Sequence, residues 1–166
     1  MSANNVVVMP RARRPGSFAI LVFGLSTFLL SGMSFAMKNT GNEYNTLYAG
    51  LGAKGYDVVA YFTDGKPTVG SDRYTAEHGG VTWRFVSKDH RDKFAANREK
   101  YAPQYGGFCS WGVAQGKLFD VDPVNGWKIV DGKLYLNFNG DIQKVWDGDS
   151  SGFISKANRN WPGLNK

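Results

Sequence analysis

The residues Trp127-Lys-Ile-Val-Asp-Gly-Lys-Leu-Tyr-Leu-Asn-Phe138 give the clearest indication of secondary structure in this chain. Two strand-like runs, 127–130 and 133–138, flank Asp131-Gly132, and an Asp-Gly pair between alternating runs is a strong short-range signal for a β-hairpin. Asn139 follows directly, and its side chain can accept hydrogen bonds from the free amides of a first helical turn. The sequence therefore predicts a hairpin that leads straight into a capped helix.

The same order of elements is predicted a second time, closer to the N-terminus. Strand-like runs at 73–77 and 81–86 are joined by His78-Gly79-Gly80, and glycine tolerates the positive φ that a tight hairpin turn requires. Ser87 is expected to cap a helix over 88–97. The two hairpin–helix units share too little sequence identity for a repeat to be predicted from the sequence.

The remaining elements are expected to be short. Residues 55–62 form a short apolar element of either type, and a brief helix is expected over 108–115. A last helix is expected over 150–160, with Pro162-Gly163 ending it. The predicted fold class is therefore α+β, a small single domain of antiparallel β-hairpins packed with short helices.

The N-terminal 36 residues are typical of a secretory signal peptide. They combine a positive start, an apolar run over 18–35 and small residues before a cut after Ala36. The alternative is an uncleaved membrane anchor, since a run of about 18 residues is close to the lower limit of about 17 for a spanning helix. We expect a periplasmic or otherwise exported protein, which would contact a membrane only through this segment if it stayed uncleaved.

After a cut, the chain would keep a flexible lead-in at 37–54 and one domain at 55–163. Half of the formal net charge of +6 comes from Arg11, Arg13 and Arg14, which a cut would remove. The charge that remains is mild and interleaved with acidic residues, so no nucleic-acid partner is expected.

Cys109 is the only cysteine of the chain. Exported proteins normally pair their cysteines or avoid them, so a single thiol is unusual. Three roles are open: a buried and inert side chain, a metal ligand, or a reactive thiol. If Cys109 lies in the first turn of the helix over 108–115, the free amides and the helix dipole would favour its thiolate.

Four blocks of the sequence resemble the YHS domain family, in particular its exported bacterial members. They are Lys54-Gly-Tyr-Asp-Val-Val-Ala-Tyr-Phe62, Trp83-Arg-Phe-Val-Ser87 with His90-Arg-Asp-Lys-Phe94, Tyr101-Ala-Pro-Gln-Tyr-Gly-Gly-Phe-Cys109 and Trp127-Lys-Ile-Val-Asp-Gly-Lys-Leu-Tyr-Leu-Asn137. In the metal-associated branch of the family, the presumed ligands are the cysteines of a Cys-Ser-x-x-Cys motif. That motif falls on Val86 to His90 here, so only His90 could bind a metal. In the exported branch the sulfur stands at the position of Cys109, and some similar proteins carry selenocysteine there, which implies a chemical role for Cys109.

The candidate metal ligands are Cys109, His90 and His78, a set suited to copper or zinc. No short spacing between them supports a site. His78 could instead be a solvent-exposed residue of the hairpin turn. His90 could instead pack on Phe94 and bond the backbone.

Three acidic residues are further candidates for a polar pocket: Asp57, Asp120 and Asp122. Each stands beside an aromatic residue or a proline, where aspartate more often caps a turn. The sequence contains no Ser/His/Asp order, no phosphate-binding glycine loop and no Cys-x-x-Cys. No enzyme class follows from it.

The leading functional hypothesis is an exported YHS-type binding module that engages a metal ion or a soft ligand through the Cys109 region. One alternative is a thiol-dependent redox protein that uses Cys109 as its nucleophile, with a thiol pKa below the free value of about 8.5. The other is a non-catalytic protein-interaction domain in which Cys109 only packs. The expected partners are accordingly a metal ion, a small ligand or another protein.

Overall fold

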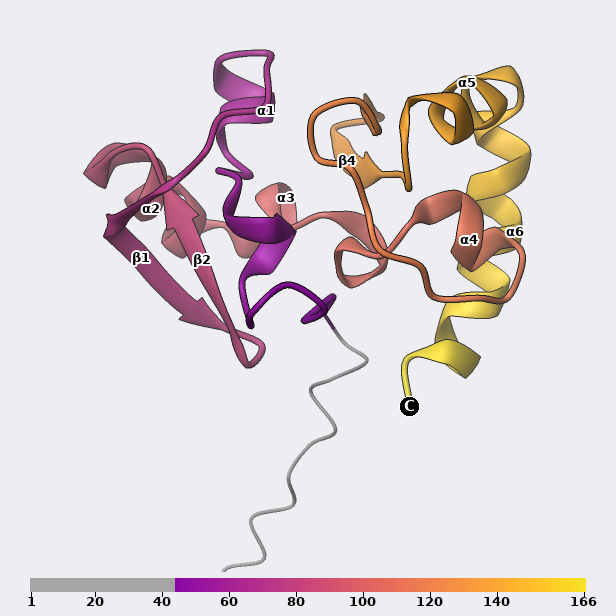
Figure 1. The fold of residues 1–166 in the computed structure, drawn as a ribbon, viewed down its shortest axis with the longest axis horizontal. Coiled ribbons are helices and arrows are strands. Elements are labelled where there is room, and N and C mark those ends of the chain that lie inside the picture. The colour runs from indigo at the N-terminus through magenta and orange to yellow at the C-terminus, as the bar shows by residue number, and fades with distance from the viewer. Residues whose placement is uncertain (1–43) are drawn as a thin grey trace, which may run out of the picture. The chain divides into compact units, whose positions relative to one another are not determined.

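The computed structural model describes residues 44–166 (Figure 1). Within that range the chain forms six α-helices, two 3-10 helices and two separate two-stranded antiparallel sheets. The predicted α+β class is therefore confirmed. The predicted signal peptide and its apolar run over 18–35 lie outside the described residues. Among residues 44–166, none of the helices has the length and apolar character needed to cross a membrane.

The first half of the described chain folds as one hairpin–helix unit, on the left of Figure 1. His78 of β1 stands opposite Val81 of β2, and both glycines between them have positive φ, as a two-residue type I′ turn requires. Ser87 accepts a hydrogen bond from the amide of His90 and caps the helix, as predicted. The elements are η1 (Gly52–Gly55), α1 (Ala60–Thr63), β1 (Ser71–His78), β2 (Val81–Phe85) and α2 (Lys88–Ala96).

A short helix, α3 (Arg98–Tyr101), leads into a second unit with the same order of elements. Asp131 and Gly132 form its hairpin turn, with φ of 50° and 70°. Asn139 accepts a hydrogen bond from the amide of Ile142 and caps the following helix, as predicted. The elements are η2 (Gln104–Gly107), α4 (Ser110–Ala114), β3 (Trp127–Val130), β4 (Lys133–Leu136) and α5 (Gly140–Gly148).

Three pairs of equivalent elements lie at the same interval along the chain, whereas β1 and β3, and α1 and α4, are spaced differently. The 3-10 helices begin at residues 52 and 104, β2 and β4 at 81 and 133, and α2 and α5 at 88 and 140. The left-handed backbone recurs as well, with φ of 47°, 56° and 83° over residues 53–55 and of 55°, 60° and 78° over residues 105–107. The described chain therefore contains two copies of one structural unit, although their sequences differ.

The core consists of two clusters, and β4 contributes to both. Leu134 and Leu136 belong to the cluster that also holds Trp83 of the first unit, whereas Tyr135 belongs to the cluster around Trp146. All three β4 residues are buried. The apolar–polar alternation expected for a half-exposed strand is therefore absent from β4, because both of its faces pack against core.

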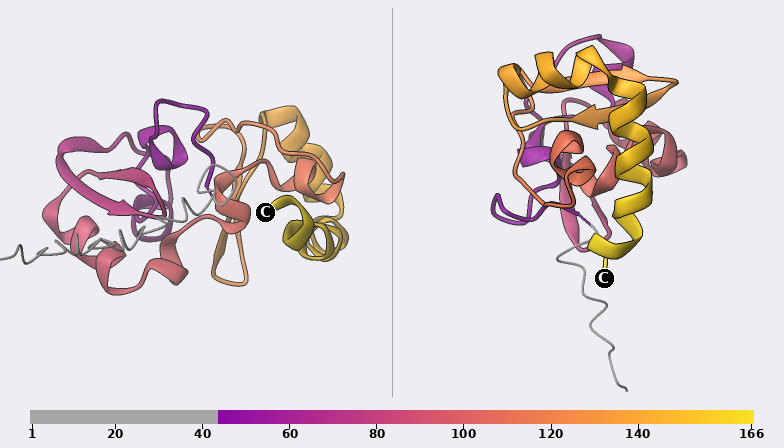
Figure 2. Two further views of the ribbon diagram at one scale, coloured as in Figure 1. Left: turned by 90° about the horizontal axis from the view of Figure 1, so that it is seen from below. Right: turned by 90° about the vertical axis from the view of Figure 1, so that its right-hand side faces the viewer.

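The last helix, α6 (Ser150–Leu164), lies along the second unit and packs against α4 (Figure 2). Asp149 caps it by accepting a hydrogen bond from the amide of Gly152. The helix continues through Pro162, so the prediction that this proline ends it is wrong. Proline lacks an amide donor and its ring crowds the carbonyl four residues earlier, but the helix still ends with the amide of Asn165 donating to the carbonyl of Trp161.

Residues 44–54 are the described part of the segment expected as a lead-in, and they pack against the rest of the domain. Asn45 is buried, its amide donates to the carbonyl of Gly106, and its side chain donates to the carbonyl of Gly107. The ring of Tyr44 contacts that of Trp83 edge-on, with centroids 5.5 Å apart. The first turn of the described chain thereby joins the two units.

Gly126 should not tolerate a side chain. A Cβ at this position would overlap the backbone carbonyl of Asn137. The two residues are already held close together, because the carbonyl of Gly126 accepts a hydrogen bond from the amide of Asn137. Overpacking of this kind costs about 1–3 kcal/mol, so Gly126→Ala should lower the midpoint of urea unfolding. The matched variant Gly148→Ala meets open space and should leave the midpoint unchanged or raise it slightly. Equal midpoints for the two variants would contradict this prediction.

Candidate functional site

Cys109 lies at the N-cap of α4, one residue before the helix, rather than inside the predicted first turn. Its side chain is fully buried. The sulfur accepts a hydrogen bond from the amide of Gly112 at 3.4 Å, and the thiol lies 3.8 Å from Oδ1 of Asn137. Cys109 is therefore enclosed by the fold and held by defined polar partners.

Burial raises the pKa of the Cys109 thiol above its ordinary value. The backbone amides of Gly112, Phe138 and Trp111 favour the thiolate, but together they offset only part of the burial effect. The thiol is therefore protonated near neutral pH. This direction is opposite to the one that the redox hypothesis requires, since that hypothesis needs a lowered pKa.

Asn137 connects Cys109 to the surface through a chain of side-chain hydrogen bonds. Its Oδ1 accepts from the amide of Trp111 at 3.0 Å, and its Nδ2 donates to Gln143 at 2.9 Å. Gln143 donates to Asp147, which also accepts from Lys128. Because Asn137 is fully buried and its side-chain donor and acceptor are both used, it fixes the start of α4 relative to α5.

Asp57 holds the corresponding place in the first unit and is also fully buried. Its Oδ1 accepts from the amides of Val59 and Ala60 at 2.8 and 3.2 Å. Its Oδ2 accepts from the amide of Val86 at 2.9 Å and lies 2.7 Å from Nδ1 of His90. One carboxylate thus joins α1, the end of β2 and α2.

Asp57 and Cys109 are equivalent residues of the two units, and the amides around them correspond one to one. The 3-10 helices start at residues 52 and 104, so both residues follow that start by the same number of positions. The amides on Asp57 belong to Val59, Ala60 and Val86, and those on Cys109 to Trp111, Gly112 and Phe138. A thiol therefore occupies in the second unit the amide-lined place that a carboxylate occupies in the first.

His90 uses both ring nitrogens within the first unit. Nδ1 faces Asp57, and Nε2 lies 3.3 Å from Oγ1 of Thr63 and 3.9 Å from Oδ1 of Asp64. A carboxylate, an imidazole and a hydroxyl in this order suit proton transfer. The Thr63 hydroxyl, however, also lies 3.2 Å from the carbonyl oxygen of Val59 and 2.7 Å from Oδ1 of Asp64. It therefore already has local acceptors in α1 and at the C-cap of that helix. The arrangement ties α1 to α2.

The three candidate metal ligands have different neighbours. Cys109 contacts Asn137, and His90 contacts Asp57. His78 is half-buried at the end of β1, where its ring contacts those of Tyr44 and Phe94. Within residues 44–166, no group of three or more His, Cys, Asp or Glu is placed to hold a metal ion. The described part of the chain therefore does not bring Cys109, His90 and His78 together as one site.

Asp120 and Asp122 both line a hollow of about 370 Å³, whose other walls include Tyr48, Val124 and Phe138. Burial opposes the ionisation of Asp120, but hydrogen bonds from Lys54, the Val121 amide and Asn45 outweigh it, so the pKa of Asp120 lies below its usual value. Asp122 caps a turn, since it accepts from the amides of Val124 and Asn125. Asp122 therefore both caps a turn and lines a pocket, the two roles the sequence left open.

An apolar cleft of about 220 Å³ adjoins Cys109 in the second unit. It is lined only by Trp111, Phe119, Phe138 and Ile142. The amide of Cys109 donates to the carbonyl of Phe119 at 3.0 Å, so the wall of the cleft lies directly against the cysteine. Phe119 and Phe138 are 37% and 50% exposed, which leaves two aromatic rings of the wall open to a partner.

No family model, no curated protein and no solved structure matches this chain. The resemblance to the YHS family therefore stays a prediction from the quoted sequence blocks.

The sequence did not single out the residues that surround Cys109. Only Asn137 could have been recognised, because it is a polar residue within the apolar run Leu134-Tyr-Leu-Asn-Phe138. A polar residue in such a run suggests a buried side chain that is hydrogen-bonded. Phe119 and Ile142 carried no such signal, since a single apolar residue on a loop or a short helix is ordinary.

Loss of the Asp57 carboxylate should destabilise the domain strongly. Asp57→Ala leaves the amides of Val59 and Val86 and the ring of His90 without their acceptor, and breaking a buried pair of this kind costs about 3–5 kcal/mol. Asp57→Asn keeps the volume and one acceptor oxygen and should lose less. Asp92→Asn changes only exposed contacts on α2, with Lys88 and Arg91, and should leave the urea midpoint nearly unchanged. A midpoint for Asp57→Ala as high as that for Asp92→Asn would refute this role.

The Cys109 thiol should react slowly in the folded protein. Its burial and raised pKa predict that a thiol reagent such as 5,5′-dithiobis(2-nitrobenzoate) labels the native chain slowly, with a rate that continues to rise with pH beyond the ordinary thiol pKa of about 8.5. In denaturing urea the same thiol should react at the rate of a free cysteine. Fast labelling of the native chain near pH 7 would restore the redox hypothesis.

Proposed function

We propose that this chain is an exported YHS-type binding module, and that it binds an apolar side chain of a protein partner in the cleft of Trp111, Phe119, Phe138 and Ile142. The observation that carries the proposal is an entirely apolar cleft whose wall lies directly against Cys109. Cys109 acts beneath the cleft as a packed structural residue.

The size of the cleft selects the kind of ligand. Sites for drug-sized molecules and cofactors occupy about 300–1,000 Å³ and combine apolar walls with a few polar groups. This cleft has about 220 Å³ and no polar lining residue. It suits one leucine-sized or phenylalanine-sized side chain, the kind of anchor that protein interfaces bury.

The surface beside the cleft extends the apolar area. Phe138 also lines the neighbouring hollow, together with Tyr48 and Val124. Tyr48, Val124 and Phe138 are 52%, 44% and 50% exposed. Exposed apolar residues that adjoin one another, with Lys54 and Asp120 beside them, are typical of a protein-binding surface.

Two observations weigh against the other functions. A nucleophilic Cys109 would need exposure and a lowered pKa, and a metal centre would need further ligands near it. Burial raises the pKa of Cys109, and its side-chain contacts are the Asn137 amide oxygen and backbone amides.

The proposal predicts that N-acetyl-L-leucinamide, a model of one apolar side chain, binds at the cleft. Titration of the full chain should produce saturable shifts of the ¹H–¹⁵N resonances of Phe119, Phe138 and Ile142. Phe138→Ala should weaken this binding by about tenfold, since loss of one aromatic wall removes about 1.4 kcal/mol of contact.

Val145→Ala is the matched control, because Val145 lies on α5 and is 52% exposed but does not line the cleft. It should leave the dissociation constant unchanged. Equal effects of the two variants, or shifts confined to other residues, would overturn the proposal.

A calorimetric titration with zinc tests the metal alternative. The heat of binding should be the same for the unmodified chain and for Cys109→Ser. Tight zinc binding that Cys109→Ser abolishes would favour a metal centre.

A further inference from the structure

The apolar cleft borders the hollow of about 370 Å³ that Asp120 and Asp122 line, and the side chain of Phe138 is a wall of both. The rings of Tyr48 and Tyr56 also line this hollow. A protein segment that places one side chain in the cleft therefore has the hollow directly beside it. The charges in the hollow decide which residue of the partner can lie next to the apolar anchor.

The hollow already holds one cation of the chain. Nζ of Lys54 lies 2.8 Å from Oδ2 of Asp120 and 3.2 Å from the carbonyl oxygen of Val121. It also lies 5.5 Å from the centroid of the Tyr48 ring, and an aromatic face attracts a cation within about 6 Å. A carboxylate, a carbonyl and an aromatic ring thus bind an ammonium group together at this place.

Asp122 is the second carboxylate of the hollow, and its charge has no such partner. Within residues 44–166 it belongs to no ion pair, and its hydrogen-bond donors are the amides of Val124 and Asn125 and the side chain of Asn125. Burial opposes its ionisation, but these hydrogen bonds and the charge of Lys54 outweigh it, so the pKa of Asp122 lies below its usual value. Asp122 is therefore ionised near neutral pH.

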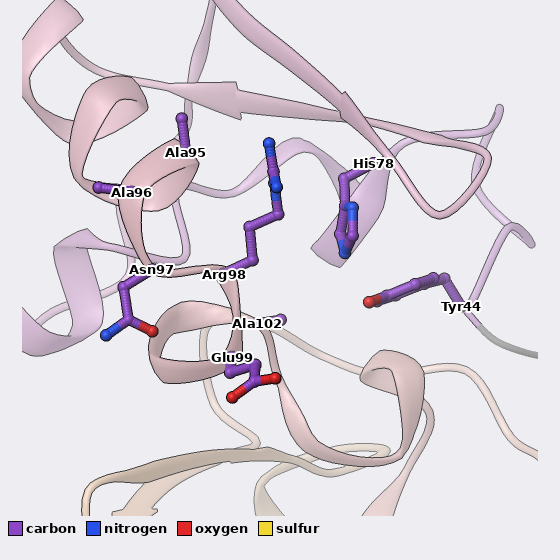
Figure 3. A pocket seen from close by; sticks show the side chains of 8 residues that line it. All are labelled: Tyr44, His78, Ala95, Ala96, Asn97, Arg98, Glu99 and Ala102. Carbon is purple, nitrogen blue, oxygen red and sulfur yellow. The ribbon is translucent and has the colours of Figure 1, made fainter.

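Two negative charges and one positive charge line this hollow, so one negative charge is left over. The hollow of about 450 Å³ in the first unit offers a comparison. It is lined by Arg98 and Glu99, whose side chains extend in different directions (Figure 3). Those two charges balance, whereas the hollow beside the apolar cleft attracts a cation.

We propose that the partner bound in the apolar cleft is a basic one, an extended protein segment with a lysine or arginine two positions from its apolar anchor. This inference rests on the proposed function and specifies its partner. Side chains two positions apart in an extended segment point to the same side and lie about 7 Å apart, so they can occupy the two sides of Phe138. The anchor enters the cleft, and the cation enters the hollow and pairs with Asp122.

Three peptides test the charge of the flanking residue. The first is acetyl-Lys-Gly-Leu-Gly-Lys-amide, and the others carry glutamine or glutamate in place of both lysines. Because the flanking residue stands on both sides of leucine, no chain direction has to be assumed. In titrations of the full chain followed by ¹H–¹⁵N spectra, the lysine peptide should bind about fivefold more tightly than the glutamine peptide, as one exposed ion pair with an aromatic contact provides. It should also shift the resonances of Tyr48 and Asp122, and the glutamate peptide should bind most weakly.

Matched substitutions locate the charge that recognises lysine. Asp122→Asn removes the charge but keeps an oxygen that can accept the amides of the turn. It should lower the affinity for the lysine peptide to that for the glutamine peptide, and unchanged binding of the glutamine peptide would show that the cleft is intact. Glu99→Gln is the control, because it removes one negative charge from the other hollow. It should leave the preference for lysine in place.

Equal affinities of the unmodified chain for the lysine and glutamine peptides would rule out a basic partner and leave the apolar cleft as a binding site. Equal effects of Asp122→Asn and Glu99→Gln would do the same. A chain that binds neither N-acetyl-L-leucinamide nor the glutamine peptide would disprove the proposed function, and this inference with it.

Discussion

The buried carboxylate of Asp57 is the interaction on which the first unit depends. Its two oxygens accept backbone amides from the start of α1 and from the residue after β2, and they hold the ring of His90 on α2. A carboxylate without water is costly unless every lone pair has a donor. Three backbone amides and the imidazole of His90 supply those donors, and they come from different elements. Asp57 therefore fixes the positions of α1, the β1–β2 hairpin and α2 relative to one another.

In the second unit, a thiol occupies the position that the carboxylate occupies in the first. Cys109 stands where Asp57 stands and faces the equivalent amides, but it needs fewer donors because a protonated thiol carries no charge. In the first unit the imidazole of His90 fills the space beside the carboxylate. In the second, Ile142 takes the equivalent position, and the space beside Cys109 opens to the surface as an apolar cleft. The difference between the two copies therefore lies at the proposed binding surface.

Local signals in the sequence predicted most of the elements. The Asp131-Gly132 and Gly79-Gly80 turns and the Ser87 and Asn139 caps all form as expected. The predictions failed where one residue was read without its surroundings. Pro162 does not end its helix, and Cys109 lies before α4 rather than in its first turn. The sequence predicted the hairpin–helix order twice but no repeat, since the two units share backbone geometry rather than residues.

Local residue patterns specify the α+β class, the two hairpins and the helix caps, because each depends on hydrogen bonds between residues two to four positions apart. The burial of the single thiol, its equivalence to Asp57 and the apolar cleft in the second unit follow only from tertiary packing. Asp57 meets Val86 and His90, and Cys109 meets Asn137, across about thirty residues of chain. Contacts of that separation are set by how the whole core packs, and no local pattern encodes them.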